Sequence, residues 1–207
     1  SISGLTAISK INNIRVMHDA KLELSGEVVI DGGNNGIAMD GNTTVTIHDG
    51  ITVKNVSADS IVNWSKTSTL KLAGNLELKS IYSSEPWTPE IIGTVTSSAP
   101  IELDWNTGKQ PADLVALKFV DGTIAGANEI FYLGGNTFGA GYLLWFDADN
   151  NVARLSKTVT NEIMLDSVIS NADQLGLKEL NIVIGGSFAV TDQVDFGGVT
   201  NVTITDD

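Results

Sequence analysis

Short runs that alternate apolar and polar residues dominate the first part of the chain. Strict alternation is typical of a β-strand with one buried face. The runs are separated by glycine and aspartate, which tolerate left-handed backbone conformations and therefore predict tight turns. Six such runs lie between residues 22 and 78: Leu22–Leu24, Val28–Ile30, Val45–Ile47, Ile51–Val53, Leu70–Leu72 and Leu76–Leu78.

These runs recur as a repeat of about 23 residues. Equivalent units begin at Leu22, Val45 and Leu70, so their starts differ by 23 and 25 residues. A second strand begins six residues after the first, and Ile37 and Ile61 begin third strands 24 residues apart. One unit cannot bury its own apolar face, so we expect the units to stack, each strand pairing in parallel with its equivalent. The inward positions would be Leu22, Leu24, Ile30, Val45, Ile47, Ile51, Val53, Leu70, Leu72, Leu76 and Leu78.

Three short strands per repeat favour an all-β solenoid built from three-strand coils. An antiparallel sandwich is the alternative, because it too has short strands at regular spacing. A sandwich gives no reason for the phasing inside each unit to repeat, so the solenoid is the prediction that we follow.

Two segments carry a family resemblance: LSGEVVIDGGNNGIAMDG, which begins at Leu24, and VTIHDGITVKN, which begins at Val45. They resemble the pectate-lyase-like right-handed parallel β-helices of bacterial cell-surface proteins, over about residues 1–80. The resemblance implies a right-handed parallel β-helix. It implies no single activity, because that superfamily holds lyases, hydrolases, adhesins and inert stalks alike.

Residues 81–111 interrupt the repeat. Ser83–Pro89 and Ser97–Pro100 have the composition of loops, so we expect an enlarged loop here. Strand-like patterns return at Ile101–Leu103, Leu114–Phe119 and Ile130–Leu133.

A hairpin and then a helix follow. Tyr142–Phe146 and Val152–Leu155 flank an Asp/Asn-rich turn and predict an antiparallel hairpin, which would cover the open edge of the coils. A short capping helix is expected near 161–175, because Asn161 or Thr160 can cap it and Gly176 ends it. Its apolar stripe consists of Ile163, Val168, Ile169, Ala172 and Leu175. Strands are expected after it at Leu180–Ile184, Phe188–Val190, Val194–Phe196 and Val199–Ile204.

This order predicts two parts: residues 1–156 as β-helix coils with a hairpin-like C-terminal cap, and residues 157–207 as a capping helix with the first coils of a following module. Such a chain would be cut from a tandem array, and its partners would include adjacent β-helix modules of the same parent chain. The alternative is one domain whose tail packs back on its own coils.

The composition excludes several classes of partner and site. Twenty-five acidic against twelve basic residues give a net charge of −13. A surface this acidic repels phosphate backbones, so we expect no nucleic-acid partner. No run approaches the roughly 18 apolar residues that span a membrane. The chain has no cysteine, which excludes disulfides and cysteine-based zinc sites.

The acidic residues form no recognisable catalytic or metal motif. Asp31, Asp40 and Asp49 are nine residues apart and each precedes glycine. A turn role is favoured, because the GGxGxD pattern of calcium-binding repeats is missing. Asp147, Asp149 and Asn151 have the first three ligand spacings of an EF-hand loop, but its later glycine and acid are missing, so a hairpin turn is favoured. We therefore predict no catalytic residue, no metal site and no cofactor.

Tryptophan supplies the strongest binding signal. Trp64, Trp87 and Trp105 lie in or beside expected loops, where they could form a platform for sugar rings. The structural interpretation is that the enlarged loop packs its tryptophans into a small core of its own.

The sequence thus favours a non-catalytic, extracellular cell-surface module, a rigid spacer or interaction scaffold that meets a glycan or a host or cell-surface ligand. Two alternatives stay open: a carbohydrate-binding module that uses the tryptophan-bearing loop, and a fragment of a polysaccharide-cleaving β-helix enzyme.

Overall fold

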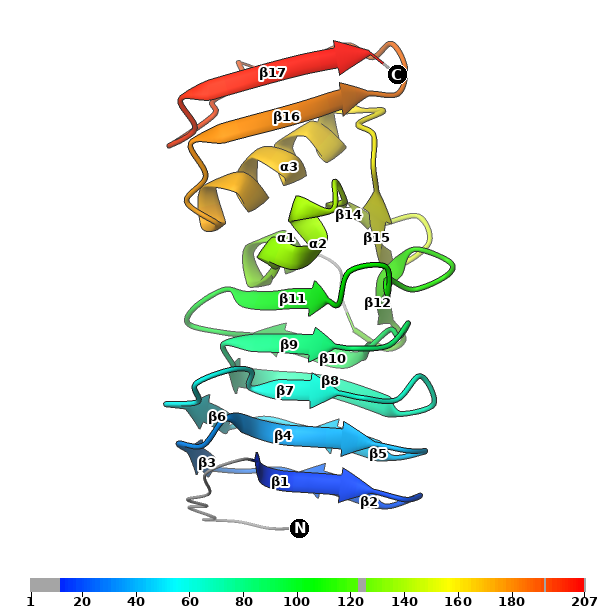
Figure 1. Cartoon of the computed structure of the whole chain (residues 1–207), viewed down its shortest axis with the longest axis vertical. Coiled ribbons are helices and arrows are strands. Elements are labelled where there is room, and N and C mark those ends of the chain that lie inside the picture. Colours follow the sequence, from blue (N-terminus) through cyan, green and yellow to red (C-terminus); the bar gives the residue numbers. More distant parts are fainter. Residues whose placement is uncertain (1–11, 123–125, 192, 207) are drawn as a thin grey trace.

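The computed structural model describes residues 12–122, 126–191 and 193–206. The molecule is elongated, and most of its strands lie across the long axis in successive layers from β1 at one end to β17 at the other (Figure 1). Residues 1–11, with which the first predicted part begins, lie outside the described residues. No helix in the described ranges is long and apolar enough to cross a membrane.

A six-stranded parallel sheet forms one side of the stack. Its order is β1-β4-β7-β9-β11-β13, so neighbours in the sheet follow each other at intervals of about one repeat. The strands are β1 (Asn12–Met17), β4 (Asn35–Asp40), β7 (Ile61–Asn63), β9 (Ser80–Ser83), β11 (Ile101–Trp105) and β13 (Phe131–Leu133).

A nine-stranded sheet forms the opposite side and a corner. Its path is β14-β15-β12-β10-β8-β5-β2, and β3 and β6 join it through β8. The pairing of β12, β15 and β14 is antiparallel, so the sheet is mixed. The strands are β2 (Lys21–Leu24), β3 (Val28–Asp31), β5 (Thr44–Ile47), β6 (Ile51–Lys54), β8 (Thr69–Glu77), β10 (Glu90–Thr96), β12 (Val115–Phe119), β14 (Leu143–Asp147) and β15 (Val152–Ser156).

The prediction of an all-β right-handed parallel β-helix with three-strand coils is wrong. The described chain is mostly β and contains two helices besides the expected one near 161–175, and its strands form several sheets, one of them mixed, rather than a solenoid. The three-strand phasing ends at β8, a nine-residue strand that pairs with β5 through Leu70 and with β6 through Leu76. Beyond β8, no strand of the described chain continues the row formed by β3 and β6.

The register of the first units agrees with the repeat. Leu22 pairs with Val45 and Val45 with Leu70, in parallel. The predicted inward residues are all buried except Leu22, which is half-buried. Gly50 occupies a corner at φ +82°, where a Cβ would lie 2.7 Å from the carbonyl oxygen of Gly26 in the preceding layer. The turn prediction at glycine is therefore correct at this corner.

Residues 81–111 contain more strand than expected. Instead of one enlarged loop, the structure has the end of β9 and all of β10, which continue both sheets, and β11 confirms the strand expected at Ile101–Leu103. Two short helices that the sequence did not indicate flank β13: α1 (Ala127–Ile130) and α2 (Gly135–Gly139). The predicted hairpin is confirmed as β14 and β15.

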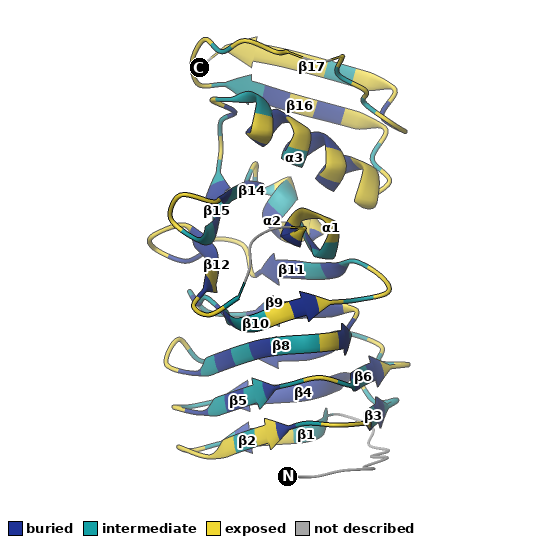
Figure 2. Ribbon diagram, turned by 180° about the vertical axis from the view of Figure 1, so that it is seen from behind, coloured by how far each residue is buried: buried dark blue, intermediate teal, exposed yellow. Residues whose placement is uncertain are grey.

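The predicted tail helix is α3 (Glu162–Gln174), capped by the Asn161 side chain, which accepts a hydrogen bond from the backbone N–H of Met164 at 2.9 Å. A second apolar core lies on this helix and includes Leu143 of β14 together with residues of the tail. A two-stranded parallel sheet, β16 (Glu179–Ile184) and β17 (Asn201–Asp206), lies on the other side of α3 (Figure 1). Figure 2 shows β16 partly buried and β17 largely exposed. No strand forms at 188–190 or 194–196, where two were expected.

Candidate functional site

Two of the three candidate tryptophans lie in the main core. Trp87 is 5% exposed and Trp105 is 2% exposed. Their indole N–H groups donate to backbone carbonyls, from Trp87 to Ser68 at 2.8 Å and from Trp105 to Trp87 at 3.0 Å. The segment after β9 therefore buries its tryptophan in the main core and not in a small core of its own, and Trp87 and Trp105 present no exposed platform.

Trp64 keeps a partly exposed indole. It follows β7, next to the β4 residue Asp40 in the sheet register. The guanidinium of Arg15 lies 5.3 Å from the centroid of the Trp64 ring and 2.8 Å from a carboxylate oxygen of Asp40. This cation–π contact links β1, β4 and the end of β7 on the outer face of the six-stranded sheet.

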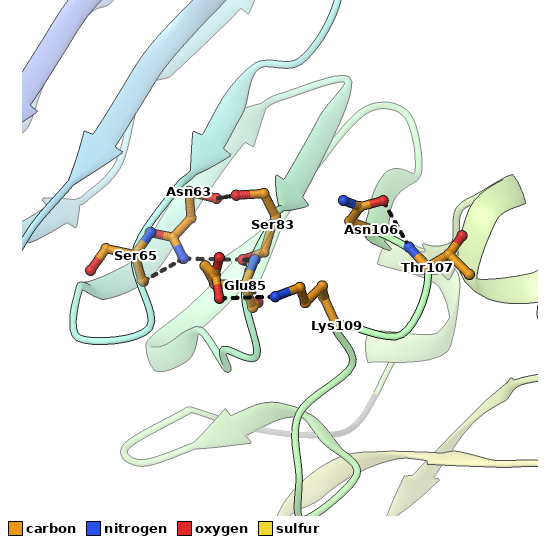
Figure 3. Close-up of polar contacts among 8 residues, drawn as sticks. Asn63, Ser65, Ser83, Glu85, Asn106, Thr107 and Lys109 are labelled. Atoms are coloured by element: carbon orange, nitrogen blue, oxygen red, sulfur yellow. Dashed lines mark hydrogen bonds and ion pairs between the residues drawn. The ribbon is translucent and has the colours of Figure 1, made fainter.

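Polar side chains hold the turns beyond β7 and β9 together (Figure 3). The buried amide of Asn63 donates to the hydroxyl of Ser83 at 3.1 Å and to the carbonyl of Ser65 at 2.8 Å. The Ser83 hydroxyl donates in turn to the carbonyl of Glu85 at 2.8 Å, and Lys109 lies 3.5 Å from the Glu85 carboxylate. These contacts join three successive layers and have a structural role.

The three regularly spaced aspartates are separated and each has its own partners. Asp31 accepts from Asn55 at 2.8 Å and lies 3.6 Å from the Lys54 amine. Asp40 pairs with Arg15, and Asp49 accepts from the backbone N–H of Asn75 at 2.8 Å. Within the described ranges, no group of three or more histidines and acids is arranged to hold a metal ion.

Asp147 belongs to the hairpin turn. Its carboxylate accepts from Nε of Arg154 at 2.8 Å and from the side chain of Asn150 at 2.8 Å. The hydrogen bond from Arg154 is the main reason that the pKa of Asp147 is lowered. These contacts give it a turn role.

A cluster that the sequence did not indicate lies on the outer face of the six-stranded sheet. Glu102 of β11 is opposite Ser80 of β9 on one side and Tyr132 of β13 on the other. Tyr82 follows two residues after Ser80, and the turn residue Asp59 accepts a hydrogen bond from the Ser80 hydroxyl at 2.8 Å. Two phenols and two carboxylates thus meet on three adjacent strands and one turn.

Burial and mutual repulsion shift the pKa values of this cluster. Burial raises the pKa of Glu102, and the charges of Asp104 and Asp59 raise it further. Burial also raises the pKa of Asp59 and of both tyrosines. Lys79 partly offsets the shift at the two carboxyl groups. A half-buried carboxyl group with a raised pKa is a candidate for ligand binding or proton exchange.

Asp104, on the same face, has a structural role. Its carboxylate accepts from the hydroxyl of Thr137 at 2.6 Å, from the backbone N–H of Thr137 at 2.8 Å and from the amide of Asn136 at 2.8 Å. These bonds fasten α2 to β11. Gly134 permits the approach, because a Cβ there would lie 2.5 Å from Cβ of Asp104 and closer still to Oε1 of Glu102.

The Asp104 carboxylate therefore accepts several hydrogen bonds within the protein, whereas the Glu102 carboxylate can accept further ones. Its nearest side-chain partner is the Tyr132 hydroxyl, at 3.5 Å, the upper limit for a hydrogen bond. Tyr82 and Lys79 lie near it, so the cluster combines hydrogen-bond acceptors and donors with aromatic surface. The sequence did not reveal the cluster because β9 lies in the segment that was assigned to a loop.

Comparisons with protein-family models, with curated proteins and with solved structures find no match to this chain. The resemblance to pectate-lyase-like proteins thus stays a prediction.

Proposed function

We propose that this protein is a non-catalytic structural module of an extracellular, cell-surface protein, in which a stiff column of strands holds a binding region at a distance. The observation that carries the proposal is the uninterrupted row of parallel pairings from β1 to β13. Neighbouring strands lie about 4.8 Å apart, so six strands span roughly 24 Å along the axis before the helix and the last sheet add to it.

One apolar row illustrates why such a column resists bending. Ile37, Ile61, Ile81, Leu103 and Leu133 are successive partners in the six-stranded sheet, and each is at most 2% exposed. Bending the column would open gaps between these side chains, and closely packed interiors tolerate gaps poorly. Several acids also serve structure, since Asp104, Asp147 and Asp31 are held by neighbouring side chains.

A length comparison tests the spacer function. The protein and a Gly/Ser chain of equal residue number are each placed between a membrane anchor and an epitope on a cell, and the height of the epitope is measured by fluorescence interference. The column should hold the epitope at one height, whereas a flexible chain gives a broad distribution of heights. A distribution as broad as that of the Gly/Ser chain would contradict the proposal.

A second candidate is glycan binding on the outer face of the six-stranded sheet. Trp64, Tyr82 and Tyr132 are partly exposed there, with Glu102 and Lys79 between or beside them. Aromatic faces stack on sugar rings, and the neighbouring polar groups match hydroxyl groups. This surface shares only Trp64 with the one that the sequence suggested.

Binding to a glycan panel, measured with the protein and with Trp64→Ala and Tyr82→Ala, tests this second function. Tyr142→Ala serves as the control, because Tyr142 packs beside Lys157 at the hairpin. We expect both outer-face variants to lose binding and the control to keep it. No binding by the wild-type protein at millimolar glycan, or equal loss in the control, would contradict the idea.

A further inference from the structure

A groove runs along the exposed side of α3. One cleft, of about 380 Å³, lies between the helix and the stacked strands and is lined by Asn128, Phe146, Ile163, Asp166, Ser167 and Ser170. A second cleft, of about 290 Å³, lies between the helix and the loop before β17 and includes Asp173, Asp195 and Gly197. Both contain Asp166 and Ser170, so the two clefts form one continuous groove.

The first half of the groove has an apolar wall that is open to solvent. Ile163 is 64% exposed, which is more than any other large hydrophobic residue in the part of the chain that the structure describes. Phe146 of β14 lies across the same cleft. Exposed apolar surface in a concave site indicates a binding partner, because covering it removes both side chains from water.

The charges of the groove all have one sign. Asp166, Asp173 and Asp195 contribute carboxylates, and neither cleft is lined by lysine or arginine. Asp173 and Asp195 are held by the backbone N–H groups of Gly198 at 3.2 Å and Gly197 at 2.9 Å. Asp166 has no ion pair or side-chain hydrogen bond within the part of the chain that the structure describes.

The C-terminal end of α3 makes the electrostatic potential of the groove more negative. Asp173 lies in the last turn of α3, where the carbonyl ends of the helix are negative and where no basic residue is present. The amine of Lys178 donates to the carbonyl of Gly198 at 3.1 Å and lies near Asp173, so it offsets part of this charge, whereas Asp166 has no such neighbour among the residues that line the clefts. The groove therefore offers a negative end and an apolar end on one helix.

We propose that this groove binds an extended basic peptide segment that carries an apolar side chain. From Ile163 to Asp173 the helix rises about 15 Å, which four or five extended residues match. The apolar side chain would lie between Ile163 and Phe146, and the lysine or arginine side chains would pair with Asp166 and Asp173. This interaction surface is separate from the outer face of the sheet and does not depend on the spacer function.

Fluorescence anisotropy with the labelled peptide Lys-Leu-Lys-Phe-Lys tests the proposal. Two groove variants, Asp166→Asn and Ile163→Ser, are compared with two matched surface variants, Asp149→Asn in the hairpin turn and Val120→Ser, where the side chain is 55% exposed. The peptide Glu-Leu-Glu-Phe-Glu provides the charge control. Circular dichroism and a denaturation curve for each variant show that it is folded.

We expect the basic peptide to bind and the acidic peptide not to bind. Each groove variant should weaken binding about five-fold, as expected for one partly desolvated contact, while the surface variants change it less than two-fold. An equal effect of Asp166→Asn and Asp149→Asn would show attraction to the net negative charge alone and would overturn the proposal. No binding at millimolar peptide would overturn it as well.

Discussion

Asn171 closes the last edge of the six-stranded sheet, and its removal should open that edge. The side chain projects from α3, is 4% exposed, and pairs with both backbone groups of Leu133 in β13. The Leu133 N–H donates to Oδ1 of Asn171, and Nδ2 of Asn171 donates to the Leu133 carbonyl at 3.4 Å. One amide thus replaces the next strand of the sheet.

The cost of Asn171→Ala follows from these two bonds. Each buried backbone group that loses its partner costs about 1–3 kcal/mol. Alanine stabilises the helix by up to about 0.7 kcal/mol relative to asparagine, because it is the better helix former, and this offsets part of the cost. Water that enters the gap lowers the penalty further, so we expect a net loss of about 1–4 kcal/mol in the free energy of unfolding.

Urea denaturation and amide hydrogen exchange measure the two consequences. Asn171→Ala should lower the unfolding midpoint, and the Leu133 amide should exchange at least about ten-fold faster than in the wild-type protein. Asn181→Ala is the matched control, because Asn181 lies exposed on β16. A loss below about 0.5 kcal/mol, with unchanged exchange at Leu133, would refute the edge-closing role.

Three further changes test the site and its supports. Glu102→Gln should stabilise the protein at pH 7, because it removes a charge that burial and Asp104 disfavour. This gain over the wild type should disappear as the pH falls from the raised pKa of Glu102 to below the ordinary value of 4.5, because the wild-type side chain is then also neutral. Urea curves at both pH values measure this, with exposed Glu179→Gln as the control, and a gain that persists at low pH would contradict it. Gly134→Ala should cost about 1–3 kcal/mol, because its Cβ meets Asp104, which is fixed by α2, whereas Gly135→Ala meets no heavy atom within 4 Å and should be tolerated. Leu72→Ala should cost about 2–5 kcal/mol, because the side chain is fully buried between layers; a loss as small as that of an exposed leucine would contradict the parallel register.

Local patterns predicted the first units well. The alternating residues around Leu22, Val45 and Leu70 identified the strands, their buried faces and their parallel partners, because period-2 burial and glycine turns are properties of neighbouring residues. The helix after Asn161 and the hairpin whose second strand begins at Val152 were predictable for the same reason.

The chain-long architecture could not be predicted from the repeat. The repeat predicts the pairing of Leu70 with Val45 and of Leu76 with Ile51, but it ends within β8, and nothing in its residues indicates that the two strands merge into one. The prolines between Ser83 and Pro100 suggested a loop, yet strand β10 lies between them and pairs with β8 and β12. Pairing over long distances decided these segments, and it overrides local composition.

The candidate site was missed for a related reason. Glu102, Tyr82 and Tyr132 are separated by at least 20 residues from one another and meet only because three strands pair in one register. The tryptophans, in contrast, indicated a binding site as single residues, but the burial of Trp87 and Trp105 depends on how their segments fold over the core. Neither fact is contained in a local pattern.

The stiffness of the column can be measured directly by pulsed electron spin resonance. The chain has no cysteine, so Lys21→Cys in β2 and Thr203→Cys in β17, both exposed, place one spin label near each end of the column. A rigid module predicts a single narrow distribution of label-to-label distances, unchanged between low and physiological salt. A broad distribution, or two separate distances, would show that the α3 end moves relative to the strands and would contradict the spacer function.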